Sequence, residues 1–278
     1  QWNCMPMGLQ AASATFQTIM ERILVGLNEH TISYVDDIVC FSATWEQHLL
    51  DVAAMLDRLC SAGITLRPKK CFIGMPEVHL LGHIVNAEGT RPDPKRLQPF
   101  IDMKFPTAFE DLQHWVGVVQ WFGNHVPECA LTLQPLRNRL TRKINTPPST
   151  AEQHAFDKLN RMLTSDEGII LLRPDFEKEF QVSTDAARTV GASAILLQEN
   201  ELGELRPISY WSRCWTGSEK HWAPVVHEGC AAYRGITEFW RYLSSNHFKL
   251  IVDAEPLMWL QTVRKPAGKL AVWAIALQ

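Results

Sequence analysis

The sequence lacks the features that mark a zinc protein, a disulfide-linked secreted protein or a membrane protein. Its seven cysteines are scattered and include no C-x-x-C pair. This argues against a zinc site and a disulfide framework, and it favours a reducing compartment. We recognise no signal-peptide pattern and no apolar run long enough to span a bilayer. We therefore expect an intracellular protein that does not contact a membrane.

The sequence also has little net charge, with 27 Lys and Arg against 30 Asp and Glu. A formal charge of -3 is not typical of a general nucleic-acid binder, so any contact with nucleic acid must come from local basic patches. Residues 67–70 and 137–143 are two such patches, and each fits a phosphate contact or a solvated face equally well. The length of 278 residues predicts two or more domains.

Two adjacent carboxylates, Asp36 and Asp37, follow Tyr34 and Val35 at the crest of a predicted short β-β unit. Neighbouring carboxylates repel each other and Asp is a poor strand former, so stability alone does not explain them. A divalent cation would remove both objections, because Mg²⁺ prefers hard oxygen ligands. An ordinary hairpin turn, in which Asp is common, is the alternative interpretation.

Hydrophobic periodicity predicts helices and strands along the whole chain. The predicted helices cover residues 11–27, 45–62, 94–103, 108–124, 131–142, 151–165, 225–243 and 255–263, and a last one begins at 269. The predicted strands, besides the β-β unit, cover residues 64–66, 71–74, 78–85, 180–184, 192–198, 206–212 and 248–252. Residues 145–150 contain two prolines and are the best candidate for a linker.

The segment Met5-Pro6-Met7-Gly8-Leu9, followed by Ala14-Thr15-Phe16-Gln17 and then by Tyr34-Val35-Asp36-Asp37, resembles a reverse transcriptase. It is most similar to the pol polyprotein of Gypsy-like long-terminal-repeat retrotransposons. The resemblance implies that Asp36 and Asp37 are catalytic, metal-binding carboxylates. It also implies substrate-binding roles for Met7, Gly8, Gln17, Tyr34, Lys70, Gly82 and His83.

The second half resembles the ribonuclease H domain that is fused to these polymerases. The similarity lies in Ser183-Thr184-Asp185-Ala186, in Tyr210-Trp211-Ser212-Arg213, and in Glu219-Lys220 with Glu228. A β-β-β-α-β order would let Asp185, Glu228 and Asp253 converge as catalytic ligands of two Mg²⁺ ions roughly 4 Å apart. The alternatives are a strand-end cap for Asp185, a solvated helix position for Glu228 and a helix N-cap for Asp253.

The resemblance implies a multidomain fold of the α+β and α/β classes. We expect the C-terminal part of a polymerase palm over residues 1–91, a helical thumb and connection over 92–178, and a C-terminally truncated ribonuclease H-like mixed sheet with helices over 179–278. The implied cofactor is Mg²⁺ or Mn²⁺. The implied partners are an RNA template, a DNA primer, deoxynucleoside triphosphates and an RNA–DNA hybrid, in a retroelement particle in the cytoplasm or nucleus.

In this family a third polymerase carboxylate and the fingers precede the first motif, and a fourth nuclease acid follows the last predicted helix. The chain contains none of these three features, so we expect a fragment that does not synthesise DNA alone. We also expect its N-terminal third to be its least stable part. Ala254 stands where the family usually has His, and Ala11 and Ser13 replace a common Asn and Pro. The alternative function is a truncated or domesticated remnant without catalysis that binds nucleic acid or protein.

Two groups of side chains invite a functional interpretation but favour a structural one. His83, His221 and His227 have no familiar ligand spacing, so we expect surface or core histidines. Trp115, Trp121 and Phe122 fall on one predicted helix, where a hydrophobic core is more common than a base-stacking platform.

Overall fold

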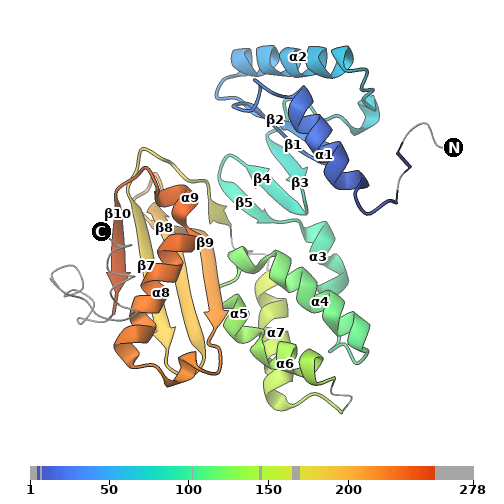
Figure 1. The fold of residues 1–278 in the computed structure, drawn as a ribbon. Coiled ribbons are helices and arrows are strands. Elements are labelled where there is room, and N and C mark those ends of the chain that lie inside the picture. The colour runs from blue at the N-terminus through green and yellow to red at the C-terminus, as the bar shows by residue number, and fades with distance from the viewer. Residues whose placement is uncertain (1–4, 7, 102, 144–145, 165–169, 254–278) are drawn as a thin grey trace. The chain divides into compact units, whose positions relative to one another are not determined.

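The computed structural model describes residues 5–6, 8–101, 103–143, 146–164 and 170–253. The chain divides into two compact units, Gln1–Leu80 and Leu81–Gln278. Both mix helices and strands, as predicted, and Figure 1 labels their elements. Among the described residues, no helix combines the length and apolar character needed to cross a membrane.

The first unit packs two helices against a hairpin. Its elements are α1 (Ala12–Ile23), β1 (Thr31–Tyr34), β2 (Asp37–Cys40), α2 (Trp45–Ser61), the 3-10 turn η1 (Pro68–Lys70) and β3 (Glu77–Leu80). The hydroxyl of Thr44 accepts a hydrogen bond from the amide of Gln47 and caps the start of α2. The buried core is small, with Met20, Leu24 and Leu59 at its centre.

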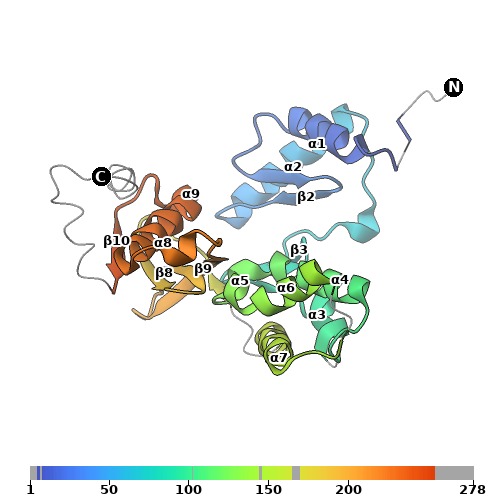
Figure 2. The same ribbon diagram turned by 60° about the horizontal axis from the view of Figure 1, so that its bottom comes forward.

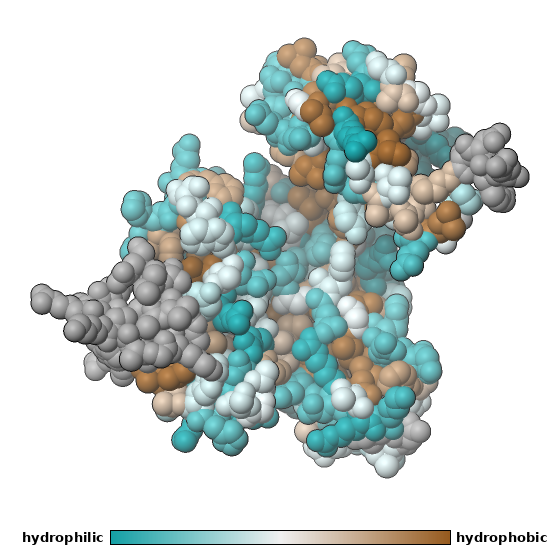
Figure 3. All heavy atoms as spheres, in the orientation of Figure 1, coloured by the Kyte–Doolittle hydropathy of each residue, from teal (hydrophilic) through white to brown (hydrophobic). Residues whose placement is uncertain are grey.

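Large apolar side chains remain exposed on this unit, and Figure 3 shows brown surface over it. The strands predicted at residues 64–66 and 71–74 are wrong, because within the described part of the chain neither segment joins a sheet. Leu66, Phe72 and Ile73 are exposed, so no partner strand buries these short apolar runs. Gly63 and Gly74 also have positive φ and bend the chain at the ends of these segments.

The strand predicted over residues 78–85 is wrong as a single element. It consists of β3 and, in the second unit, β4 (His83–Asn86). Leu81 and Gly82 interrupt it with φ values of 50° and 82°, which an extended strand does not contain.

A helical core makes up the middle of the second unit. It contains α3 (Pro94–Ile101), α4 (Phe109–Trp121), η2 (Gly123–His125), α5 (Cys129–Thr132), α6 (Gln134–Arg142) and α7 (Thr150–Thr164) (Figure 2). Trp115 and Phe156 meet at its centre, with ring centroids 4.7 Å apart. The helix predicted over residues 131–142 is therefore two helices, and the one predicted over 108–124 ends in a 3-10 turn.

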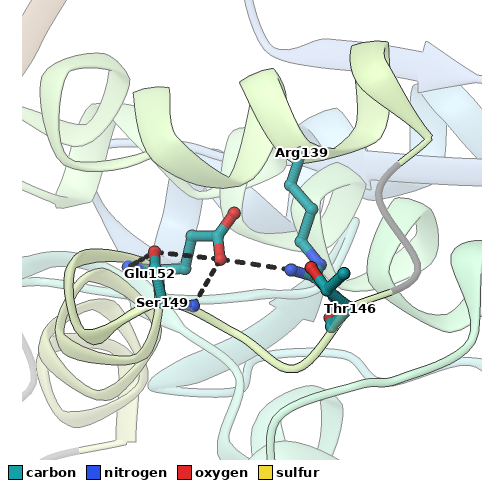
Figure 4. Close-up of polar contacts among 4 residues, drawn as sticks. All are labelled: Arg139, Thr146, Ser149 and Glu152. Carbon is teal, nitrogen blue, oxygen red and sulfur yellow. Dashed lines mark hydrogen bonds and ion pairs between the residues drawn. The ribbon is translucent and has the colours of Figure 1, made fainter.

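The described part of the linker candidate, residues 146–150, is fixed rather than free (Figure 4). The Glu152 carboxylate accepts hydrogen bonds from the amide and hydroxyl of Ser149 and from Arg139 Nη1 at 3.1 Å. Arg139 Nη2 also donates to the carbonyl of Thr146. This capping box joins α6 to α7, so the segment does not separate compact units. Arg139 is buried in this ion pair, which excludes it from the proposed phosphate-binding patch.

Two short strands of the second unit were not predicted, namely β5 (Gly89–Pro92) and β6 (Leu171–Leu172). The strand β5 pairs antiparallel with both β4 and β6. Gly89 is required there, because a Cβ at this position would lie 1.8 Å from the Leu171 carbonyl oxygen. A four-residue strand bounded by Gly and Pro, and a two-residue strand, are too short to give a periodic signal.

The last part of the second unit is a four-stranded sheet in the order β10-β7-β8-β9. Its elements are β7 (Phe180–Ala187), β8 (Gly191–Glu199), β9 (Leu205–Cys214), α8 (Pro224–Glu238), α9 (Trp240–Leu243) and β10 (Phe248–Val252). Helix α8 covers one face of the sheet, as Figure 1 shows. The predicted strands are confirmed, but the helix predicted over residues 225–243 breaks at Phe239. The helices predicted beyond Asp253 lie outside the described residues.

Candidate functional site

Two of the predicted nuclease carboxylates stand on neighbouring parallel strands. The strands β7 and β10 are paired in register, and Val252 lies opposite Thr184. Asp185 follows Thr184 and Asp253 follows Val252, so both aspartates lie at the same end of the sheet. Parallel pairing fixes this arrangement, because both strands run in the same direction to that edge.

The third carboxylate, Glu228, is carried by α8, which packs very closely on the sheet. A Cβ at Gly235 would lie 2.7 Å from the Ala194 Cβ and 3.3 Å from the Thr184 Cγ2. Only glycine allows the helix to approach β7 at this distance. Glu228 precedes Gly235 by two helical turns and therefore shares its face of α8. The close approach brings Glu228 to the edge that carries Asp185.

Electrostatics shows that the three carboxylates interact. Burial, followed by the charges of Asp185 and Asp253, raises the pKa of Glu228 to about 7, against a partial lowering by a hydrogen bond from Ala186. One carboxylate oxygen of Glu228, Oε2, is buried and has no hydrogen-bond partner among the described residues. A buried polar atom without a partner is costly unless a ligand satisfies it.

The chemistry of these carboxylates suits a hard divalent cation, but their side chains do not lie close enough together to surround one. In the described part of the chain, no three His, Cys, Asp or Glu side chains form a group tight enough to hold a metal ion. Nevertheless, mutual repulsion and an unsatisfied oxygen at Glu228 are the two costs that a bound Mg²⁺ would remove. The residues therefore fit the ion, provided that the side chains move closer when it binds.

The second candidate site is the β1–β2 hairpin of the first unit, where the predicted β-β unit is confirmed. Tyr34 pairs with Asp37, and the two-residue loop consists of Val35 and Asp36. Tyr34, Asp36 and Asp37 are all exposed at this tip. Val35 has a φ of 50°, in the left-handed region that a β-branched residue rarely occupies.

Gln17 of α1 holds this strained turn. Its Oε1 accepts a hydrogen bond from the amide of Val35 at 2.6 Å, and its Nε2 donates to the Ser33 carbonyl at 3.0 Å. The side-chain amide thus binds the backbone on both sides of Tyr34, as a neighbouring strand would. Sequence reasoning gave Gln17 a role at the substrate, whereas in this structure its contacts are with the turn that carries Asp36 and Asp37.

The remaining residues predicted to bind substrate are divided between the units. Met7 lies outside the described residues. Gly8 and Lys70 are exposed in the first unit, and Lys70 belongs to η1. Gly82 lies just before β4 in the second unit, and His83 is the first residue of that strand. The His83 ring lies 5.0 Å from both the Phe122 and the His125 rings.

The expectation of structural histidines agrees with their positions. His221 is exposed and His227 is buried, whereas His83 is half-buried. Burial lowers the pKa of His83, while burial and the neighbouring His83 lower the pKa of His125 to about 4.

The expected aromatic core is confirmed for Trp115 and Phe122 but wrong for Trp121. That side chain is 55% exposed and donates through Nε1 to the Leu81 carbonyl.

The sequence suggested no role for Gly235 and Trp215, and for His227 only that of a surface or core histidine. In the structure these residues make contacts on or beside the elements that carry Asp185 and Glu228. Gly235 follows Glu228 by two helical turns on the same helix face, and this spacing could have predicted close packing of the helix on a sheet. The contacts of Trp215 and His227 depend on tertiary structure and gave no pattern in the sequence.

Two protein-family models match the chain. Residues 1–85 match the reverse transcriptase (RNA-dependent DNA polymerase) model, and residues 175–278 match the RNase H-like domain found in reverse transcriptase. The retrovirus-related Pol polyproteins from transposons 297 and opus of Drosophila melanogaster are 31% and 30% identical over 98% and 97% of this chain. The chain covers 25% and 28% of those proteins. The transposon Tf2-3 polyprotein of Schizosaccharomyces pombe is 25% identical over the whole chain, which covers 21% of it.

Solved structures match the fold over the whole chain. The foamy viral protease–reverse transcriptase in complex with dsDNA gives a TM-score of 0.80 at 19% identity, and this chain covers 58% of it. The same viral protein in complex with an RNA/DNA hybrid gives a TM-score of 0.77, with 38% of it covered. The chain spans about a quarter of the length of the curated relatives it matches.

Proposed function

The chain belongs to the Pol polyproteins of long-terminal-repeat retrotransposons, as a reverse transcriptase and RNase H-like segment, and from this premise we propose that its second unit hydrolyses the RNA strand of an RNA–DNA hybrid. Asp185, Glu228 and Asp253 form the active site. The raised pKa and unpartnered buried oxygen of Glu228, beside two aspartates, are the observation that carries the proposal.

In this proposal the three carboxylates hold Mg²⁺ or Mn²⁺. When bound, two such ions supply an activated water and stabilise the charge that develops on the leaving 3′ oxygen. With a pKa of about 7, Glu228 would carry a proton in about half of the metal-free molecules at neutral pH, and its ionised form would be the metal ligand. Asp185 and Asp253 are exposed at the sheet edge, where they face incoming substrate. The packing of α8 on β7 keeps Glu228 half-buried and limits the water around it.

For the first unit, we propose that Asp36 and Asp37 supply two of the metal ligands of a polymerase site. Gly8, Gln17, Tyr34 and Lys70 would lie near template, primer or deoxynucleoside triphosphate. Among the described residues no third acidic group completes a metal site there, and we expect no DNA synthesis by this chain alone. In this assignment residues 1–91 belong to the palm, 92–178 to the thumb and connection, and 179–278 to the nuclease domain. Gly82 and His83, at the end of the palm, would contact the primer.

Cleavage of a labelled RNA–DNA hybrid in Mg²⁺ tests the nuclease proposal. We expect the chain to cut the RNA strand and Asp185→Asn to abolish cutting. Glu201→Gln is the matched control, because Glu201 is an exposed carboxylate in the β8–β9 turn. No cleavage by the folded chain, or equal cleavage by Asp185→Asn, would overturn the proposal and favour a non-catalytic module that binds nucleic acid or protein.

A further inference from the structure

Trp215 directly follows β9 and contacts both β7, which carries Asp185, and α8, which carries Glu228. Its indole Nε1 donates a hydrogen bond of 2.8 Å to the carbonyl of Ala187, two residues after Asp185 on β7. Its ring stacks on the imidazole of His227, with centroids 4.7 Å apart and planes 26° apart. His227 immediately precedes Glu228 on α8. One side chain therefore links the strand of Asp185 to the helix of Glu228.

The imidazole is fixed from its other side as well. His227 Nε2 donates to the Glu219 carbonyl at 2.7 Å, and this carbonyl can only accept, so the hydrogen lies on Nε2. His227 Nδ1 is then an acceptor, buried and without a partner among the described residues. An apolar ring would avoid this unsatisfied nitrogen but would lose the bond to Glu219. Histidine at this position therefore incurs the cost of one buried nitrogen without a partner and gains a directional hydrogen bond to the Glu219 carbonyl.

Glu219 is itself held in place, so the contact reaches back to the sheet. Its carboxylate accepts hydrogen bonds from Arg213 Nη2 at 2.5 Å and from the Thr216 amide at 2.8 Å. Burial alone would raise the pKa of Glu219, but the bonds from Thr216 and Arg213 lower it below the usual value. The Arg213 guanidinium also lies 5.7 Å from the centre of the Trp215 ring. The stack is therefore clamped between β9 and the turn that leads into α8.

We propose that the Trp215–His227 stack is a positioning pair that sets the distance between Asp185 and Glu228, and thereby the affinity of the site for divalent cations. This inference rests on the proposed function, since it assumes that these carboxylates bind metal. Gly235 fixes α8 against β7 further along the helix, and the stack fixes the end that carries Glu228. Two fixed points along α8 leave Glu228 little freedom to move away from Asp185.

Mn²⁺ binding to the whole chain, measured from the electron paramagnetic resonance signal of free Mn²⁺, tests the inference without relying on catalysis. We expect Trp215→Leu to weaken binding about tenfold, because it removes both the stack and the bond to Ala187. Trp215→Phe retains a ring for stacking and should weaken binding less. Trp240→Leu is the matched control, since Trp240 is 57% exposed on α9 and should leave the affinity unchanged.

A second measurement separates positioning from general loss of structure. In Trp215→Phe, hybrid cleavage should fall at low Mn²⁺ and return to its full rate at high Mn²⁺, whereas an unfolded fraction would lower the maximum itself. Mn²⁺ binding that depends on Asp185 but is equal in the chain and in both Trp215 variants would overturn the positioning role alone. The absence of Asp185-dependent binding in the unsubstituted chain would overturn the proposed function and this inference together.

Discussion

Glu228 is the residue whose behaviour with pH follows most directly from its surroundings. Its pKa is raised from 4.5 to about 7 in the folded chain, so the folded state binds a proton that the unfolded state has released between those values. The contribution of Glu228 to stability therefore falls as pH rises from 4.5 to 7, and above pH 7 the ionised group opposes folding.

The first prediction is that Glu228→Gln stabilises the metal-free chain at pH 8 by a few degrees in melting temperature and has little effect near pH 4.5. Thermal unfolding in a chelator, followed by circular dichroism at both pH values, measures this. Glu238→Gln is the control, because Glu238 is an exposed carboxylate on the same helix. An equal gain at both pH values would show that the burial and repulsion of an ionised Glu228 are not the cause.

Val35 and Gln17 make a second prediction at this scale. Val35→Gly should stabilise the hairpin, because glycine adopts a positive φ without the strain of a branched side chain. Gln17→Leu should destabilise the first unit by about 1–2 kcal/mol, because it removes two hydrogen bonds to the turn and each is usually worth about 1 kcal/mol. In the Val35→Gly background the same substitution should cost less, since the turn no longer needs to be held.

Denaturant unfolding of the four variants measures the coupling between Gln17 and Val35. Glu21→Gln is a suitable control, because Glu21 accepts the other hydrogen bond of Gln17 Nε2. Strict additivity of the two substitutions would contradict the assigned role of Gln17.

Among the elements, α8 shows how a single backbone contact positions a site. We predict that Gly235→Ala shifts α8 away from the sheet and weakens Mn²⁺ binding several-fold, because the new Cβ would lie 2.7 Å from the Ala194 Cβ of β8 and 3.3 Å from the Thr184 Cγ2 of β7. Gly217→Ala is the matched control, since a Cβ there would meet no described atom within 4 Å. Unchanged affinity in a folded Gly235→Ala variant would mean that helix–sheet distance does not control the site.

The elements also show what the sequence could predict. The helix α2 and the strand β10 have clear periodicity, and their observed bounds differ from the predicted ones by at most one residue. Short apolar runs such as residues 71–74 carry no information on whether a partner strand exists, and here the exposed Phe72 shows that none covers them. The break at Phe239 and the change of backbone conformation at Leu81 and Gly82 involve only one or two residues, and periodicity does not register them.

For the carboxylate site, the sequence identified Asp185, Glu228 and Asp253, but not what holds them together. The register of β7 with β10 pairs residues 68 positions apart, such as Phe180 and Phe248. The approach of α8 at Gly235 likewise depends on contacts with Thr184 and Ala194, which are distant in the sequence. The stack of Trp215 on His227 joins residues only 12 positions apart, but no pattern in the sequence marked it.

At the scale of the whole molecule, the two units differ in how much core they bury. The first has three fully buried apolar side chains in its cluster, whereas the helical core of the second contains Trp115, Phe156 and many aliphatic residues. We predict that amides of the first unit exchange with solvent much faster than those of β7 and β8. Hydrogen exchange measured by mass spectrometry tests this, and uniform protection across both units would contradict it.

The most direct test of the central claim is to locate Mn²⁺ in crystals of the chain by anomalous scattering. We expect anomalous peaks between Asp185, Glu228 and Asp253, with Glu228 Oε2 as a ligand. We expect these peaks to be lost in Asp185→Asn. Anomalous density only elsewhere, or none at saturating Mn²⁺, would contradict the assignment of these carboxylates as a metal-dependent nuclease site.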